Sequence, residues 1–279
     1  MAPFNGTEQM DGYWGPPTST LDWCEANYEV SRFIAEFWNT ITNLSMIIPP
    51  LYGIIQCYRQ GLENIHILNY ALLLLTGIGS WMFHMTLLFE MQLLDELPMV
   101  WGASCMLYTL YITEVPLKKQ RQFAGMVIIV YAATLTISYL IIQNPLYYQI
   151  LYGVLISGYI LLGIRKNCRI SGEAAGVLYF GGLILYAIGF AFWNIDTKFC
   201  GLITSTRNSR TLKHGFLAFL SPLTQLHGWW HVMAGYAGYI NITLCIKHRL
   251  NQLNVKNCIE PSIVGFKISV DKLCKEKMS

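Results

Sequence analysis

Apolar residues gather into seven long runs along the chain, and short polar segments separate the runs. The runs lie near residues 33–55, 65–86, 93–112, 123–143, 146–164, 174–195 and 222–246. Each is close to the roughly 20 residues with which a helix crosses a bilayer, and all are too long for buried strands. Only helices and closed barrels satisfy backbone hydrogen bonds within lipid. The pattern therefore predicts an all-α, polytopic membrane protein with seven transmembrane helices.

Composition agrees with this class. Of 279 residues, 54% are hydrophobic and 13% are charged, whereas soluble proteins carry about a quarter charged residues. The first 32 residues are polar and lack the apolar stretch of a cleavable signal peptide. We therefore expect three parts: an N-terminal segment (1–32), a seven-helix transmembrane domain (33–246) and a C-terminal tail (247–279).

The basic residues predict the orientation. Of the 19 Lys and Arg residues, five fall on the face that carries the N-terminus and fourteen on the opposite face. The positive-inside rule then places the N-terminus in the lumen and the C-terminus in the cytosol. Lys275 and Lys277 resemble a dilysine retrieval signal, which favours a membrane of the endoplasmic reticulum or the Golgi without separating the two.

Cysteine positions add one pairing. Among eight cysteines, only Cys24 and Cys200 fall on the proposed lumenal side, where disulfides persist. We predict that these two pair, and two free thiols are the alternative.

Ionisable residues are rare within the runs, and each is expensive in lipid. Because consecutive helices alternate in direction, all of them are expected near the membrane face that carries the N-terminus. They are Glu36, His84, Asp95, Glu96, His227 and His231. This convergence predicts a functional site at that end of the helices.

The histidines favour a metal ion. His227 and His231 are four residues apart, so both rings project from one face of a helix. With His84 at the same depth, three imidazoles and an open fourth position suit zinc, which turns water into a nucleophile near neutral pH. The alternative is a set of histidines that hydrogen-bond within a helix core.

Two further residues suggest hydrolysis. Ser80 lies four residues before His84 and shares its helix face, from which the hydroxyl can bind a carbonyl oxygen or an oxyanion. Its alternative is a serine bonded to its own helix backbone. Asp95 can accept a proton or orient a histidine, whereas Glu96 points elsewhere and receives no role.

A second polar group precedes the first helix and contains Asp22, Glu25, Asn27 and Glu36. Such oxygen ligands suit calcium, but their spacing fits no EF-hand. Taken alone, these residues favour a solvated acidic segment.

Several motifs resemble those of one family, the alkaline ceramidases. These are GSWMFH with Ser80 and His84, LLDELP with Asp95, and QLHGWWH with His227 and His231. GYWGPPTSTLDWCEANY, IAEFWNT and FWNID are most similar to the type-three, phytoceramidase form. The family belongs to a wider group of seven-helix metal hydrolases that includes the adiponectin receptors.

The resemblance implies zinc-dependent hydrolysis of the amide of ceramide, phytoceramide or dihydroceramide to a sphingoid base and a fatty acid, with calcium stimulation and an alkaline optimum. It implies zinc on His84, His227 and His231, with Ser80 and Asp95 as catalytic residues beside it. It implies calcium on Asp22, the Trp23 carbonyl, Glu25, Asn27 and Glu36.

The implied partner is a membrane lipid, and we expect no nucleic acid and infer no protein partner. Other functions remain open at this point. A seven-helix receptor with a structural zinc ion is the main alternative. A transporter would show inverted repeats and broken helices, and the sequence shows neither.

Overall fold

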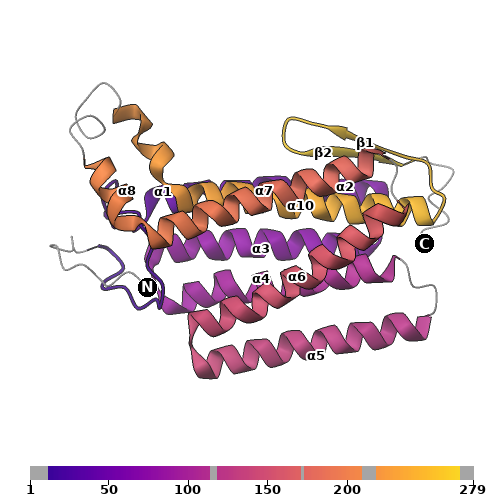
Figure 1. Cartoon of the computed structure of the whole chain (residues 1–279), viewed down its shortest axis with the longest axis horizontal. Helices are drawn as coiled ribbons and strands as arrows, with labels where there is room; N and C mark the ends of the chain where they lie inside the picture. Colours follow the sequence, from indigo (N-terminus) through magenta and orange to yellow (C-terminus); the bar gives the residue numbers. More distant parts are fainter. Residues whose placement is uncertain (1–11, 114–117, 171–172, 209–217, 271–279) are drawn as a thin grey trace.

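The fold is an assembly of long helices that run side by side, as the computed structural model in Figure 1 shows. It describes residues 12–113, 118–170, 173–208 and 218–270. The long helices are α2 (Leu44–Gln60), α3 (Asn64–Thr86), α4 (Phe89–Ile112), α5 (Lys118–Ile142), α6 (Pro145–Ile170), α7 (Glu173–Lys198) and α10 (Leu226–Gln252). The short elements are α1 (Phe37–Thr42), α8 (Cys200–Arg207), η1 (Ala218–Thr224) and the strands β1 (Asn257–Pro261) and β2 (Phe266–Val270).

Each apolar run predicted from the sequence coincides with one long helix, and the first run coincides with α1 and α2 together. Within the described residues, four helices are long and apolar enough to cross a membrane: Asn64–Thr86, Lys118–Ile142, Pro145–Lys166 and Gly176–Lys198. The mainly helical fold with four candidate membrane-spanning helices in the described residues is therefore confirmed, whereas the count of seven spans stays a prediction.

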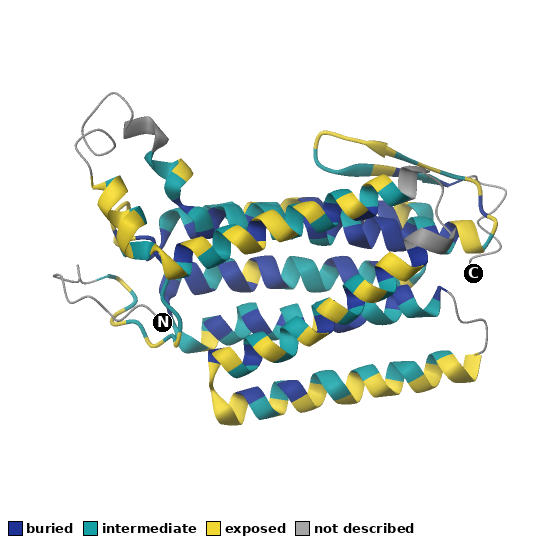
Figure 2. Ribbon diagram, in the orientation of Figure 1, coloured by how far each residue is buried: buried dark blue, intermediate teal, exposed yellow. Residues whose placement is uncertain are grey.

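The outer surface of the helices is apolar. In Figure 2 the helix α5, at the edge of the assembly, is largely exposed, whereas α3 and α10 are largely buried. Exposed residues of α5 include Ile129 and Ile141, which are 68% and 77% accessible. A continuous apolar surface of this kind is unfavourable in water and favourable in a bilayer, so the packing supports a membrane protein.

The first helix starts later than the run 33–55 predicts. Helix begins at Phe37, and the residues before it are extended: the Glu36 amide donates to the His84 carbonyl over 2.9 Å. Phe33, Ile34 and Ala35 are apolar and therefore look helical in sequence, but they precede the helix: Phe33 lies half-exposed in a turn, and the Ala35 amide donates to the Met85 carbonyl in the last turn of α3 over 2.9 Å. This segment brings the acidic N-terminal residues to the histidines.

The last helix extends beyond residue 246 to Gln252, and an antiparallel β-hairpin follows it. Ile268 of β2 is fully buried in a core cluster that also contains Tyr239 and Ile246 of α10. The folded body therefore continues to residue 270, into the segment expected to be a tail. Lys275 and Lys277 of the expected retrieval signal lie outside the described residues.

Candidate metal centre

Three buried histidines from α3 and α10 lie close together inside the assembly of helices. His84 lies in the last turn of α3, and His227 and His231 lie in the first two turns of α10. One ligand atom from each ring lies within 4.8 Å of the others, and no other group of three His, Cys, Asp or Glu side chains in the described residues does so. All three side chains are buried. The structure therefore brings together the imidazoles that the sequence placed at one depth.

His84 is oriented by a carboxylate. Its Nδ1 atom lies 2.5 Å from Oε2 of Glu36, and both side chains are buried. A carboxylate that accepts the Nδ1 proton fixes the tautomer and leaves the Nε2 lone pair to a metal ion. Asn39 donates to the same Glu36 oxygen over 3.2 Å, so the carboxylate is itself held in place.

His231 is oriented from α1 in the same manner. Its Nδ1 atom lies 3.0 Å from the Asn39 carbonyl and 3.1 Å from Oγ1 of Thr42. Because the Thr42 hydroxyl donates its own proton to the Trp38 carbonyl over 2.8 Å, its oxygen is an acceptor toward the histidine. The Nδ1 proton of His231 is thus shared by two acceptors, and Nε2 is left to a ligand.

His227 has an unsatisfied nitrogen. Its Nδ1 atom is buried without a hydrogen-bond partner in the described part of the chain, and leaving such an atom unpaired costs about 1–3 kcal/mol. The indole of Trp23 stacks on the imidazole, with ring centroids 3.7 Å apart. Three buried imidazoles, two of them oriented through Nδ1, fit a three-histidine metal ion.

Ser80 and Asp95 meet beside this centre. The Ser80 hydroxyl donates to the Asp95 carboxylate across the contact between α3 and α4. The helices approach closely because residue 79 is glycine: a Cβ atom there would overlap the carbonyl of Leu94. Ser80 lies one turn before His84 on the same face of α3, and its hydrogen bond links that helix to Asp95 of α4.

Glu25 caps the first turn of α1. Its two carboxylate oxygens accept the amides of Trp38 and Asn39 over 2.7 and 2.8 Å, and an anion is favourable at a helix N-terminus. Burial, followed by the negative charge of Glu36, raises the pKa of Glu25 to about 8. A cation beside these carboxyls would relieve the same two effects.

The other residues of the expected calcium set lie nearby. Asp22 accepts the amide of Trp23 over 3.1 Å, and burial raises the pKa of its carboxyl. Oε1 of Glu36 and Oδ1 of Asn27 are buried acceptors without a partner among the described residues. Unpaired hard oxygens suit calcium, but the carboxylates do not converge as closely as the histidines. The calcium set therefore stays a prediction.

The N-terminal segment is bonded to α8, which lies far from it in the sequence. Cys24 and Cys200 form a disulfide across 176 residues of sequence, which is the pairing expected from their positions. Arg207 of α8 donates to the Cys24 carbonyl over 2.6 Å and to Oγ1 of Thr224 over 3.0 Å. These bonds hold the segment over the histidines.

Sequence reasoning missed several supporting residues. Asp196 of α7 is buried and accepts the Cys24 amide over 3.1 Å and the His227 backbone amide. Asp196 lies in the FWNID motif, and its position at the end of an apolar run is the sequence feature that could have identified it. Asn39 and Thr42 lie in α1 and contact His231, and no feature of the sequence identified them as its partners.

Glu96 faces away from the metal centre. Its carboxylate accepts from Tyr139 over 2.5 Å and from Gln92 over 3.2 Å, and its backbone carbonyl accepts from Tyr148 over 2.7 Å. These bonds tie α4 to α5 and α6, so the residue has a structural role in the packing of three helices.

The chain is similar to known proteins over the region that contains these residues. A sequence model of a protein family described as Ceramidase matches residues 15–261, which contain all three histidines. Alkaline ceramidase 3 of Mus musculus is 40% identical over 238 residues, covering 85% of this chain and 86% of the relative. An alkaline ceramidase of Saccharomyces cerevisiae is 35% identical over 270 residues, covering 88% and 81%. The alkaline ceramidase of Arabidopsis thaliana is 28% identical over 247 residues, covering 87% and 89%.

Proposed function

The chain belongs to the alkaline ceramidase family and is an amide hydrolase, and on that premise we propose that it is a zinc-dependent intramembrane ceramidase. The proposed substrates are ceramide, phytoceramide and dihydroceramide, and the products are a sphingoid base and a fatty acid. The proposed topology has seven membrane spans, with α1 and α2 forming the first. The N-terminus is lumenal and the C-terminus cytosolic, in endoplasmic reticulum and Golgi membranes.

The observation that carries this proposal is the meeting of His84, His227 and His231, two of which have an Nδ1 partner. Glu36 orients the first ring, and Asn39 and Thr42 orient the third. Held in this way, His84 and His231 keep their Nε2 atoms for a metal ion. A zinc ion bound there supplies a Lewis acid for the amide carbonyl and activates water near neutral pH.

The protein's own residues account for the proton transfers. Asp95 takes a proton from the attacking water and later delivers it to the departing sphingoid amine. Ser80, which donates to Asp95 in the structure, turns its hydroxyl to the amide oxygen and stabilises the negative charge that develops there. An alkaline optimum follows if Asp95 or the attacking water must be deprotonated for the reaction.

Calcium has a structural role in this proposal. Asp22, Glu25, Asn27 and Glu36, with the Trp23 carbonyl, belong to one segment that crosses the end of the helices. A calcium ion there neutralises the adjacent carboxylates and holds the segment against α1. Because Trp23 also stacks on His227, an ordered segment supports the position of that ring.

The test is hydrolysis of fluorescent ceramides by the purified full-length chain, with and without a zinc chelator. We expect chelation to abolish hydrolysis and zinc to restore it. His231→Ala should remove both the hydrolysis and the bound zinc while the protein stays monodisperse. His248→Ala, on the same helix but several turns away, is the matched control and should retain both. A metal-free protein that remains fully active would refute the zinc assignment, and active His231→Ala would make the metal structural.

A further inference from the structure

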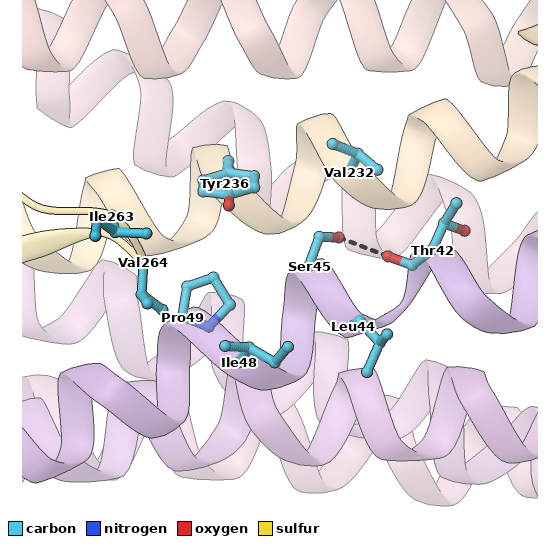
Figure 3. A pocket seen from close by; sticks show the side chains of 9 residues that line it. All are labelled: Thr42, Leu44, Ser45, Ile48, Pro49, Val232, Tyr236, Ile263 and Val264. Atoms are coloured by element: carbon cyan, nitrogen blue, oxygen red, sulfur yellow. Dashed lines mark hydrogen bonds between the residues drawn. The ribbon is translucent and has the colours of Figure 1, made fainter.

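A groove lies on the outside of the helices, between α2, α10 and the tip of the β-hairpin. Figure 3 shows it from close by, with side chains from all three elements around it. Its volume is about 350 Å³, within the range of small-ligand sites. The lining residues are Thr42, Leu44, Ser45, Ile48, Pro49, Val232, Tyr236, Ile263 and Val264.

Most polar groups that line the groove are already hydrogen-bonded within the protein. The Ser45 hydroxyl donates to the Thr42 carbonyl over 2.8 Å and lies 3.2 Å from the His231 carbonyl, and the Thr42 hydroxyl donates to the Trp38 backbone. Beyond these paired groups, the polar side chain in the lining is Tyr236. Apolar walls with one phenol suit a hydrocarbon chain and not a headgroup, which carries several polar atoms.

The groove is continuous with a surface that faces lipid. Leu44, Ile48, Leu51 and Ile55 follow one another at intervals of three or four residues, so they form one stripe along α2. Each is about two-fifths to one-half exposed, and the first two also line the groove. In a chain embedded in a bilayer, acyl chains lie against this stripe and have direct access to the groove.

The hairpin tip forms the far wall. Residues 261–266 contain no charged side chain, and Ile263 is fully exposed. The hairpin is nevertheless held firmly, because the Phe266 amide donates to the Tyr239 hydroxyl over 3.0 Å and the two rings stack. The tip therefore presents an uncharged surface with an exposed isoleucine to the groove.

We propose that this groove binds one acyl chain of a bilayer phospholipid, at a site separate from the one where the amide is cleaved. The two sites share a wall: the groove ends at Thr42, whose oxygen accepts from Nδ1 of His231, whereas the reacting amide approaches the opposite nitrogen of that ring. A chain in the groove packs against Thr42 and keeps it on His231. The proposal depends on the membrane location of the chain and not on its ceramidase activity.

The test uses the purified full-length protein in phosphatidylcholine vesicles that contain a phosphatidylcholine with a photoreactive diazirine in its acyl chain. After irradiation, mass spectrometry locates the labelled residues. We expect labelling of Ile48, Val232 and Ile263 to exceed that of Ile129 several-fold. Ile129 is the matched control, since it is apolar and exposed on α5 without lining the groove.

Two variants fill the groove from opposite walls, Ile48→Trp from α2 and Val232→Trp from α10. Each should reduce labelling of Ile263 several-fold and leave labelling of Ile129 unchanged, and Ile129→Trp should change neither groove position. Equal labelling of Ile129 and the groove residues would overturn the proposal, because it would indicate ordinary lipid contact. Labelling of Ile263 that persists in both variants would also overturn it.

Competition with unlabelled lipids separates this site from the catalytic one. Because the groove accepts hydrocarbon chains without reading a headgroup, we expect equal added amounts of unlabelled ceramide and unlabelled phosphatidylcholine to reduce the labelling of Ile263 equally. If ceramide reduces it at a much lower concentration than phosphatidylcholine does, the groove belongs to the substrate site and the proposal of a separate site is wrong. Hydrolysis is measured on the same vesicles, so a failure of the proposed ceramidase activity is recorded independently of the labelling.

Discussion

Glu36 holds His84 in the structure: Oε2 of the carboxylate lies 2.5 Å from Nδ1 of the imidazole, although 48 residues separate the two in sequence. The pair joins the extended N-terminal segment to the end of α3. Glu36 belongs both to the histidine site and to the acidic segment: its Oε2 atom contacts His84, and its Oε1 atom has no hydrogen-bond partner in the described structure.

Removing this carboxylate should weaken metal binding. We expect Glu36→Leu to lower zinc affinity about 10- to 100-fold, the usual effect of losing a partner of a metal-bound histidine. Glu36→Gln keeps an acceptor for the Nδ1 proton and should lose less. Competition with a chromophoric chelator in calcium-free buffer measures the affinity. Zinc binding by Glu36→Leu at wild-type strength would show that the contact does not orient His84.

The Thr42 hydroxyl should matter less, because His231 has a second acceptor in the Asn39 carbonyl. We expect Thr42→Val to lower zinc affinity by about 10-fold, the lower end of such effects, through the loss of one acceptor. Thr42→Ser keeps the hydroxyl and is the matched control, so it should bind zinc as the wild type does. The same chelator competition distinguishes them, and equal affinities for the valine and serine variants would contradict the prediction.

Gly79→Ala should separate α3 from α4. The added methyl group would overlap the Leu94 carbonyl, and backbone atoms in packed helices cannot move without cost. We expect a lower thermal midpoint and a large loss of hydrolysis, because Ser80 moves away from Asp95. Gly153→Ala is the control, since a Cβ atom on that glycine of α6 meets nothing within 4 Å. Equal thermal midpoints for the two variants would show that the close approach at Gly79 is not required.

The disulfide should contribute to stability. We expect Cys24→Ser to lower the unfolding free energy by about 2–4 kcal/mol, because the oxidised chain loses less entropy on folding. Cys200→Ser should have the same effect, and the double variant should add nothing further. Cys258→Ser removes an exposed free cysteine and should change nothing. Thermal unfolding under non-reducing conditions provides the comparison, and additive effects of the two substitutions would argue against pairing.

An ion pair at the other end of the helices predicts a pH dependence. Glu63, before α3, accepts two hydrogen bonds from Arg249 over 2.7 and 2.6 Å. Burial raises the pKa of Glu63, but the hydrogen bond and charge of Arg249 outweigh it, and the pKa falls below the ordinary value of 4.5. A lowered folded-state pKa gives stability that is complete above the unfolded-state pKa and is lost as the pH falls through the folded-state pKa.

We therefore expect Glu63→Gln to be less stable than the wild type by about 1 kcal/mol near neutral pH. Below about pH 4.5 the difference should shrink, because the Glu63 carboxyl then takes up a proton first in the unfolded chain and, at lower pH, in the folded protein. Thermal midpoints of both proteins from pH 3.5 to about pH 7 measure this. A difference that stays constant over the whole range would mean that the charge of Glu63 is not the cause.

The long helices were predictable because hydrophobic length alone determines a membrane-crossing helix. The start of the first helix was not, since Ile34 and Ala35 are equally apolar in a helix and in an extended segment. The hairpin at residues 257–270 was also missed, because its alternating apolar positions are few and its partner, Tyr239, is on a distant face of α10.

The meeting of the histidines could be predicted from depth, because consecutive helices alternate in direction and His84, His227 and His231 all fall at the same end. Their partners could not. Contacts such as that between Asn39 and His231 depend on how each helix is rotated about its axis. A run that is apolar on all sides does not fix this rotation, so only the packed structure shows which polar groups face one another.

The order of the ligands along the chain has a consequence for biosynthesis. His84 is made early, but His227 and His231 arrive with α10, after more than three-quarters of the chain has left the ribosome. A nascent chain therefore holds one of three imidazoles until its last long helix inserts. If the proposed metal site carries the activity, the membrane in which the protein is made is protected from premature lipid cleavage, and we expect a product terminated before residue 226 to be inert.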